Sequence, residues 1–264
     1  MMKNNDIDGG RAFDWGKTSD DYAKYRDIYP PQFYEILTAR GLCTAGQTVL
    51  DIGTGTGVLP RALCAQGAHF TGVDLVENQI AQARRLAQEA GQEIDFLCCP
   101  AEELPFAPQT FDVVTACQCF SYFDHAVLAP KLSAVLKPGG RFVVLYMAWL
   151  PAEDAVAGQS ERLILQYNPA WTGCGETRRE IGIPAAYAPY FTVEQRVLFD
   201  VDVPFTRESW HGRIKACRGV GASLSEAEVA AFAREHRALL ARIAPERFAV
   251  KHYAAAAILQ KRTP

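Results

Sequence analysis

Residues 49–59 read VLDIGTGTGVL, a short apolar run that passes into three alternating glycines. This pattern predicts a buried strand, a tight turn and then a helix. Glycine allows a positive φ and lets a ligand approach the backbone where a Cβ would block it. The first turn after the first strand of an open parallel sheet is a common place for adenosine-type cofactors. The segment therefore predicts an α/β domain with a ligand site at this turn.

The spacing of the glycines separates two classes of cofactor. A dinucleotide fingerprint reads G-x-G-x-x-G and places a pyrophosphate at the helix N-terminus. Here the spacing is G-x-G-x-G, and Asp51 stands two residues before the first glycine. A carboxylate there would repel a pyrophosphate and accept hydrogen bonds from an ammonium group. The segment resembles motif I of the class I S-adenosylmethionine-dependent methyltransferases, and its alternative is an ordinary glycine-rich loop.

A second apolar strand is predicted over residues 69–75, and it ends in the acid Asp74. In nucleotide folds an acid at this place accepts hydrogen bonds from the ribose hydroxyls, so Asp74 is the candidate for that role. The alternative is that Asp74 is the N-cap of the next helix, a position that also favours aspartate. That helix is predicted over residues 77–90 from its apolar spacing, with Gly91 ending it.

Residues 94–106 resemble the third motif of the same family, which often reads D-A-x-x-L-P-F. This chain departs from the motif because Pro100 stands at the usual aspartate position. The resemblance then implies that the backbone N–H of Ala101 faces the adenine ring and that Glu102 supplies the contact to the 6-amino group. The alternative for Glu102 is a first-turn helix acid that faces water.

Residues 110–124 resemble the family's fourth strand and the loop after it, where a frequent form is Q-x-x-H-W-F-D. This chain keeps Gln118 but has Ser121 and Tyr122 where His-Trp often stands, so one common candidate base is absent. The turn K-P-G-G at 137–140 and a fifth strand over 141–146 are also typical of the family. The resemblance covers roughly residues 20–148.

The resemblance implies a Rossmann-like α/β fold: an open seven-stranded, mostly parallel sheet with helices on both faces and a helical cap from insertions around strand six. It implies S-adenosyl-L-methionine as the cofactor. The implied cofactor-binding residues are Tyr22, Arg26, Asp51, Gly53, Thr54, Gly55, Gly57, Asp74, Leu75, Gln79, Ala101, Glu102, Cys117 and Gln118.

Composition excludes several classes of protein. The chain has 264 residues, 49% of them hydrophobic, and a net charge of −3, whereas a nucleic-acid-binding protein is expected to carry a basic surface. The sequence contains no run of about 18 apolar residues, so we expect no transmembrane helix. The N-terminus is polar and lacks the apolar stretch of a signal peptide. The eight cysteines lack paired zinc-ligand spacing, so we expect no metal and reduced thiols in a cytoplasmic protein.

Residues 1–12 are predicted to be a disordered tail, followed by an aromatic leader at 13–29. The leader resembles the Y-x-x-x-R-P-x-Y-P segment of a small-molecule branch of the family, the methyltransferase type 11-like branch, in which it folds over the cofactor. Tyr22, Tyr25 and Arg26 are its candidate contacts, and plain packing onto the sheet edge is the alternative. An aromatic face beside a sulfonium gains from a cation–π contact.

The predicted organisation is a core at 13–148 and a remainder at 149–264 that belongs to the same domain. Within the remainder we expect a helix near 155–166, a strand at 193–205, helices over 206–217 and from Ser225, and a last strand at 248–259. The regions 150–190 and 206–243 are then cap insertions, which in the resembled family cover the substrate.

Substrate contacts are expected from the loop after strand four and from the second insertion. The candidates are Ser121, Tyr122, Trp210, Arg213 and Arg218. His211 is the candidate general base because an unperturbed imidazole titrates near neutrality. The alternative is that these residues form a solvated helix face.

The sequence therefore predicts methyl transfer from S-adenosylmethionine to a small-molecule acceptor, with neither a nucleic acid nor a membrane as partner. It predicts neither the acceptor atom nor the oligomeric state. A protein that binds the cofactor without catalysis is one alternative. A nucleic-acid methyltransferase is another, although the N/D-P-P-Y/F turn of amino-methylating members is absent at Gln118–Ser121. The glycine spacing disfavours a nicotinamide dehydrogenase.

Overall fold

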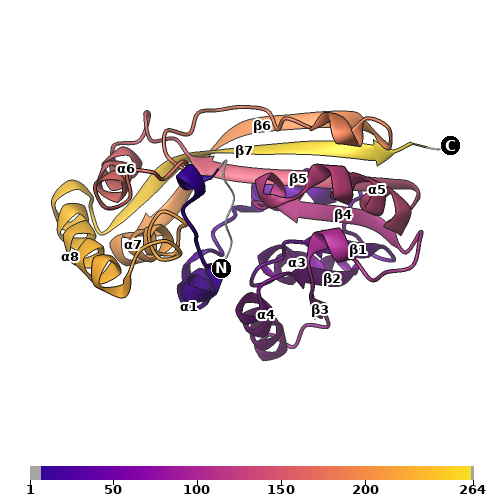
Figure 1. The fold of residues 1–264 in the computed structure, drawn as a ribbon, viewed down its shortest axis with the longest axis horizontal. Helices are drawn as coiled ribbons and strands as arrows, with labels where there is room; N and C mark the ends of the chain where they lie inside the picture. The colour runs from indigo at the N-terminus through magenta and orange to yellow at the C-terminus, as the bar shows by residue number, and fades with distance from the viewer. Residues whose placement is uncertain (1–6, 263–264) are drawn as a thin grey trace. The chain divides into compact units, whose positions relative to one another are not determined.

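The computed structural model describes residues 7–262, and the strands in that range form one seven-stranded sheet (Figure 1). The strands are β1 (Thr48–Ile52), β2 (His69–Asp74), β3 (Asp95–Cys98), β4 (Phe111–Cys117), β5 (Leu136–Trp149), β6 (Phe191–Thr206) and β7 (Arg247–Lys261). Their order in the sheet is β3-β2-β1-β4-β5-β7-β6. The chain proceeds outward from β1 in both directions, and ligands of open α/β sheets bind at such a switch of direction.

Strands β1 to β5 pair in parallel. In the register of the sheet, Leu50 of β1 lies beside Thr71 of β2 and Val114 of β4. The pairs β2–β3 and β4–β5 are parallel too. Val49, Leu50 and Ile52 are all buried. A strand of a parallel sheet is covered on both faces, which explains why this run is continuously apolar.

Strand β7 is antiparallel to its two neighbours, β5 and β6. Near its start, Lys251 O accepts a hydrogen bond from the N–H of Leu150, which follows the end of β5. Near its end, the Lys261 ammonium donates to the carbonyl of Leu136 at the start of β5. The same reversal holds toward β6, because the Arg262 N–H donates to Tyr190 O, just before β6 begins. The sheet is therefore mostly parallel, and the predicted Rossmann-like α/β fold is confirmed.

Four of the helices had a predicted range or start, and they lie close to it. The helices are α1 (Ser19–Tyr25), α2 (Pro31–Thr38), α3 (Val58–Leu63), α4 (Glu77–Glu89), α5 (His125–Val135), α6 (Ala155–Tyr167), α7 (Arg207–Lys215) and α8 (Glu226–Ile243). The predicted helices at 77–90, 155–166 and 206–217 are confirmed as α4, α6 and α7. Gly91 follows α4 with a φ of 63°, a conformation that glycine adopts at little cost after a helix end.

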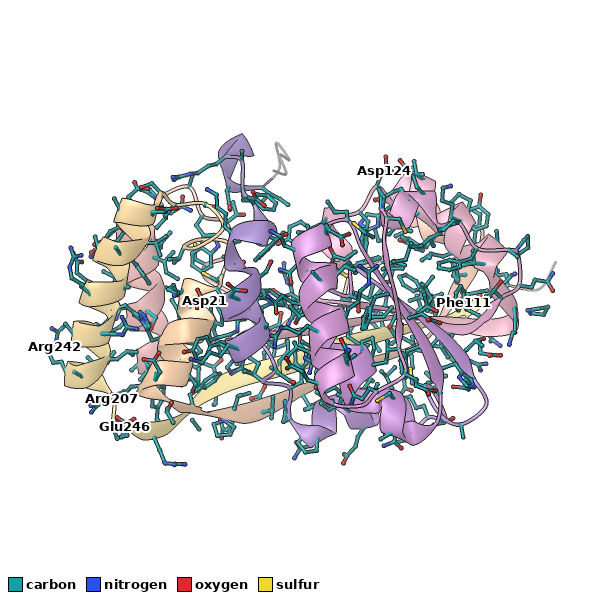
Figure 2. The ribbon with its side chains drawn as sticks, turned by 90° about the horizontal axis from the view of Figure 1, so that it is seen from below. Asp21, Phe111, Asp124, Arg207, Arg242 and Glu246 are labelled. Atoms are coloured by element: carbon teal, nitrogen blue, oxygen red, sulfur yellow. The ribbon has the colours of Figure 1, made fainter. Side chains whose placement is uncertain are left out.

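Helices α8 and α5 each begin at a side chain that satisfies free backbone N–H groups. At α8 the Ser225 hydroxyl accepts from the Glu228 N–H and the Glu228 carboxylate accepts from the Ser225 N–H, which is the predicted capping box. At α5 the Asp124 carboxylate accepts two N–H groups of the first turn (Figure 2). These caps fix where both helices start.

The chain divides into two compact units, and the division differs from the predicted one. Unit 1 contains the described residues up to Tyr29, with Ala148–Arg178 and Asp200–Tyr253; unit 2 contains Pro30–Met147, Arg179–Phe199 and the residues from Ala254 onward. We predicted the leader within the cofactor core, whereas it groups with parts of both insertions. Residues 179–190, predicted as cap, belong to unit 2.

The predicted disordered tail needs correction over residues 7–12, while residues 1–6 lie outside the described residues. Asp8–Gly10 form a short 3-10 helix. The Asp8 carboxylate lies 2.8 Å from the Arg218 guanidinium, and its side chain is fully buried. An ion pair between residues so far apart in the sequence leaves no local pattern, so the polar composition alone was misleading.

Each unit has its own core. In unit 2 the apolar faces of β1, β4 and β5 pack with α5, and the rings of Phe142 and Tyr187 stack at 5.7 Å. In unit 1 Trp210 of α7 is fully buried, with the rings of Phe205 and Trp149 at 4.9 and 5.5 Å. No helix within residues 7–262 has the length and apolarity needed to span a bilayer.

Candidate active site

The glycine turn after β1 has a left-handed backbone at three alternating positions. The φ angles are 63° at Gly53, 57° at Gly55 and 73° at Gly57. A Cβ on Gly53 would lie 2.8 Å from Cys119, and one on Gly57 would lie 2.8 Å from the ring of Phe96. The packing of the protein thus requires glycine at positions 53 and 57. The left-handed backbone favours glycine at all three positions.

Asp51 lies in the buried part of β1, two residues before the turn. Its side chain is 2% exposed, and one oxygen accepts a 2.6 Å hydrogen bond from the Thr115 hydroxyl. Burial raises the pKa of Asp51 to about 6. A nearby cation would favour the charged carboxylate, as the predicted ammonium contact requires.

Asp74 connects the end of β2 to the glycine turn. One oxygen accepts from the Gly55 N–H and the other from the Val76 N–H, each at 2.9 Å. The N-cap of α4 is Val76, which provides no side-chain cap, so the alternative of Asp74 as N-cap is wrong. Burial raises the pKa of Asp74. The acid predicted to bind ribose is therefore attached directly to the turn predicted to hold the cofactor.

Glu102 is already engaged by the protein. It lies in the 3-10 helix Ala101–Glu103, and its Oε1 accepts the Asp124 N–H at 2.9 Å. The carboxylate therefore holds the loop before α5, and Glu102 is also a half-buried acid in the first turn of this 3-10 helix, as the alternative stated in part. Ala101 is buried beside it.

Gln118 follows β4 in an unusual conformation. Its φ is 64°, uncommon for a residue other than glycine, and its N–H donates to Leu145 O at 3.0 Å. Its side-chain amide donates to the carbonyl of Met147. Gln118 is thus fixed between the ends of β4 and β5. Ser121 is exposed and Tyr122 half-buried in the 3-10 helix that follows.

The remaining predicted cofactor residues of unit 2 lie along the same strand ends. Thr54 and Gln79 are buried, Cys117 is half-buried at the end of β4, and Leu75 is 49% exposed. The Thr54 N–H donates to Val73 O and so ties the turn to β2. Unit 2 therefore brings the glycine turn and the residues that end β2 and β4 to one edge of its sheet, with Gln79 in the first turn of α4.

Two residues of unit 2 were not predicted. Cys119 covers Gly53, and its thiol lies 3.1 Å from the carbonyl oxygen of Ile52. His125 Nδ1 lies 3.2 Å from the hydroxyl of Tyr187, and burial lowers the pKa of His125. No sequence pattern links His125 to Tyr187, because the two lie in segments far apart along the chain.

His211 does not suit the predicted role of general base. It is buried in unit 1, and its Nδ1 lies 3.0 Å from Nδ1 of His236, whose Nε2 lies 3.0 Å from the Ser160 hydroxyl. The Trp210 indole donates to the same hydroxyl at 3.0 Å. Burial, with a smaller effect of Arg237, lowers the pKa of His211 to about 4. A neutral imidazole with this pKa is a weak base at neutral pH.

The three arginines that were predicted as contacts in unit 1 differ in their surroundings. Arg218 forms the ion pair with Asp8 and a further hydrogen bond to Thr172, so its charge is compensated within the protein. Arg26 donates to the hydroxyl of Tyr22 at 3.1 Å and lies over its ring at 4.6 Å. Arg213 is 6% exposed and forms no ion pair with an acid among residues 7–262.

The leader is attached to α7. The Asp21 carboxylate of α1, marked in Figure 2, lies 2.9 Å from the Lys215 ammonium. The Tyr25 hydroxyl donates to Glu208 at 3.0 Å. A Cβ on Gly212 would lie 2.2 Å from the Tyr25 ring, so the two helices approach closely there. The packing alternative describes α1, although the partner is α7 and not the sheet edge.

We expect Gly212→Val to destabilise the protein by about 1–3 kcal/mol, because its side chain would overlap the Tyr25 ring. Urea unfolding measures the change. Gly182→Val is the matched control, since a Cβ at Gly182 meets nothing within 4 Å. Adding Tyr25→Ala should recover part of the loss. Equal stability of both valine variants would show that α1 does not pack on α7.

The chain resembles known methyltransferases in sequence. Residues 50–144 match a family described as a methyltransferase domain. The ubiquinone biosynthesis O-methyltransferase of Pseudomonas paraeruginosa is 32% identical over 163 residues, which are 61% of this chain and 69% of that protein. The chain belongs to the class I S-adenosylmethionine-dependent methyltransferases. The expected family is thereby confirmed.

The similarity to other relatives of the family covers less of their length. The ubiquinone biosynthesis O-methyltransferase of Aromatoleum aromaticum is 36% identical over 134 residues, 49% of this chain and 56% of that protein. The one of Idiomarina loihiensis is matched over 40% of its length. The chain thus spans about half of the length of these curated relatives.

Solved structures agree on the fold of this family member. The YcgJ protein from Bacillus subtilis has a TM-score of 0.52 at 23% identity, and the match covers 88% of this chain and 99% of that one. A putative methyltransferase from Bacillus halodurans has a TM-score of 0.54 at 17% identity, covering 88% and 100%. At these identities the likeness concerns the fold.

Proposed function

We propose that the chain transfers a methyl group from S-adenosylmethionine to a small-molecule acceptor. The observation that carries the proposal is the glycine turn between two acids. Asp51 precedes the turn in a buried strand, and Asp74 accepts from the N–H of its middle glycine, Gly55. Family membership supports the same cofactor.

The two acids have different roles in this proposal. Asp51 accepts from the ammonium of the methionine part, and the charge of that ammonium offsets the cost of a buried carboxylate. Asp74 accepts from the ribose hydroxyls with the lone pairs that its two backbone hydrogen bonds leave free. The left-handed glycines keep the turn free of side chains where the cofactor passes.

Other residues of unit 2 have positioning or contact roles. Glu102 holds the loop before α5, so we propose that it positions the Ala101 backbone beside the adenine. Gln118 fixes the end of β4 through its two bonds to the β5 side. Ser121 and Tyr122 remain the proposed acceptor contacts of unit 2.

The reaction is an in-line displacement at the methyl carbon of the sulfonium. Bound S-adenosylmethionine would supply a methyl group on a sulfonium; the acceptor lone pair would form the new bond to carbon, the carbon–sulfur pair would stay on sulfur as the neutral thioether, and the proton of a hydroxyl or amine acceptor would pass to solvent. The cofactor supplies the leaving group, so the protein needs no nucleophile of its own. Its main contribution is orientation, which can lower a barrier by on the order of 7–11 kcal/mol.

Release of S-adenosylhomocysteine from labelled cofactor tests the proposal. The purified chain should bind S-adenosylmethionine and methylate members of a panel of small phenols, amines and carboxylic acids. DNA and RNA serve as further acceptors in the same assay. Binding without turnover on any acceptor would favour a non-catalytic binding protein, and turnover on nucleic acid alone would contradict the small-molecule class.

We expect Asp74→Ala to weaken binding of S-adenosylhomocysteine by roughly 1–3 kcal/mol, or about 5- to 150-fold, because it removes a partner of the ribose hydroxyls. Calorimetry measures the loss. The 2′-deoxy analogue of the ligand separates this contact from a general effect on the Gly55 turn. The analogue should bind the native chain more weakly than S-adenosylhomocysteine does. Asp74→Ala should reduce the affinity for the analogue by a smaller factor than the affinity for S-adenosylhomocysteine. Equal losses for both ligands would contradict the ribose role.

A further inference from the structure

Arg213 of α7 is a buried cation in unit 1. Its side chain is 6% exposed in all, and its Nε and Nη1 make no hydrogen bond to any described residue. Arg218 of the same unit is compensated, since its side chain pairs with the Asp8 carboxylate. Arg213 is therefore an exception that the packing of unit 1 does not account for.

A second guanidinium acts on Arg213. Burial first, and then the positive charge of Arg26, lower the pKa of Arg213 to about 9. The side chain still carries its charge at neutral pH. The Cys217 thiol and the hydroxyls of Tyr22 and Tyr29 act in the opposite direction and raise the pKa of Arg213 by less. Two like charges thus act on one another within unit 1.

Such an arrangement is unfavourable in a protein without a ligand. A buried charge costs several kcal/mol unless an opposite charge and hydrogen bonds compensate it. The donors of a guanidinium lie in its plane, and carboxylates bind them through two parallel hydrogen bonds. An anion on Arg213 would supply both kinds of compensation.

One aromatic ring lies directly at the guanidinium of Arg213, and further rings lie next to it. The guanidinium of Arg213 lies over the Trp149 ring at 4.9 Å, and Trp149 contacts the rings of Trp210 and His252. Arg26 lies over the ring of Tyr22 at 4.6 Å. These rings favour an anion with an apolar body over a fully hydrated inorganic ion.

We propose that Arg213, with Arg26 beside it, binds the carboxylate of a small organic acid that carries an aromatic or apolar body. Both arginines belong to unit 1, so the binding does not depend on the function proposed above. Arg213 supplies the paired hydrogen bonds to the carboxylate, and Arg26 adds a second positive charge.

Benzoate, titrated into the full chain at pH 7, is the probe. Benzamide has the same shape without the charge, and sulfate has charge without the ring. We expect benzoate to bind at least about tenfold more tightly than either, and Arg213→Met to lose about 10- to 150-fold of that affinity. Arg237→Gln is the matched control in the same unit, an arginine whose side chain is 57% exposed, and should bind benzoate unchanged.

Thermal unfolding without ligand separates this role from a structural one. Arg213→Met should raise the melting temperature, because a methionine in place of an uncompensated cation removes its burial cost. Benzoate should raise the melting temperature of the native chain and not that of the variant. A lower melting temperature for Arg213→Met, together with equal benzoate binding by both proteins, would overturn the proposal.

Titration with S-adenosylmethionine distinguishes the failure of this proposal from that of the proposed function. Its affinity should stay within about threefold in Arg213→Met, since the glycine turn and its two acids bind the cofactor in the proposed function and Arg213 does not. A loss as large as that for benzoate would assign the pair to the carboxylate of the cofactor and overturn the inference. Benzoate binding in a chain that binds no S-adenosylmethionine would support the acid site and contradict the proposed function. Sulfate binding as tight as benzoate would exclude the organic acid.

Discussion

Replacing Gly55 by valine is expected to abolish measurable binding of S-adenosylmethionine, a loss of at least about 100-fold. The backbone at Gly55 has a φ of 57°, where a β-branched side chain is strained by about 1–2 kcal/mol. Its N–H also donates to Asp74, so a shift of the turn moves both the backbone and the acid. The valine side chain would project where the cofactor must lie against the turn. Calorimetry measures the affinity.

Gly91→Val is the matched control for this prediction. Gly91 has a nearly equal φ of 63°, and a Cβ there would meet nothing within 4 Å. The control variant should lose similar stability and keep its affinity for the cofactor. Undiminished binding by Gly55→Val would mean that the glycine turn is not the cofactor site.

We expect Asp51→Asn to weaken S-adenosylmethionine binding by about 10- to 150-fold, the effect of removing a charged hydrogen-bond partner. The free protein should not lose stability at pH 8. Burial raises the pKa of Asp51 from 3.8 to about 6, which corresponds to a cost of roughly 3 kcal/mol for the charged form. Urea unfolding and calorimetry on the same samples measure the two quantities.

Folding stability and cofactor affinity should depend on pH in opposite directions through Asp51. The pKa of Asp51 is raised in the folded protein, so this group favours the fold below pH 3.8 and loses that contribution as pH rises through about 6. Binding of a cation has the opposite dependence, because it requires the carboxylate. Affinity of the native chain should fall by up to about tenfold per pH unit below pH 6, and that of Asp51→Asn should stay level. Asp95→Asn replaces an exposed acid of β3 and is the control, so its affinity should change with pH as that of the native chain does. A native profile as level as that of Asp51→Asn would contradict the ammonium contact.

Local patterns predicted the fold of the parallel strands well. The apolar run at 49–52 with its glycines and the acid at 74 that ends β2 depend on neighbours in sequence, and both lie in the sheet as expected. The capping box at Ser225 is equally local. Patterns of this kind follow from backbone conformation and burial, which the residues themselves specify.

Long-range pairing explains what the sequence did not predict. Nothing near Asp8 indicates that Arg218 will pair with it, and nothing near Tyr25 indicates its approach to Gly212. His211 looked like a base because its ordinary pKa is near neutral, but its burial beside His236 lowers that pKa. Roles that depend on desolvation require the packed structure.

Titration of the native chain with S-adenosylmethionine and with NAD⁺ at pH 7.5 tests the central claim most directly. The structure and the family predict saturable binding of S-adenosylmethionine that Gly55→Val abolishes and Gly91→Val retains. They predict no binding of NAD⁺, whose pyrophosphate would lie near Asp51. Binding of NAD⁺ with no response to S-adenosylmethionine, or equal binding by the two valine variants, would contradict the account.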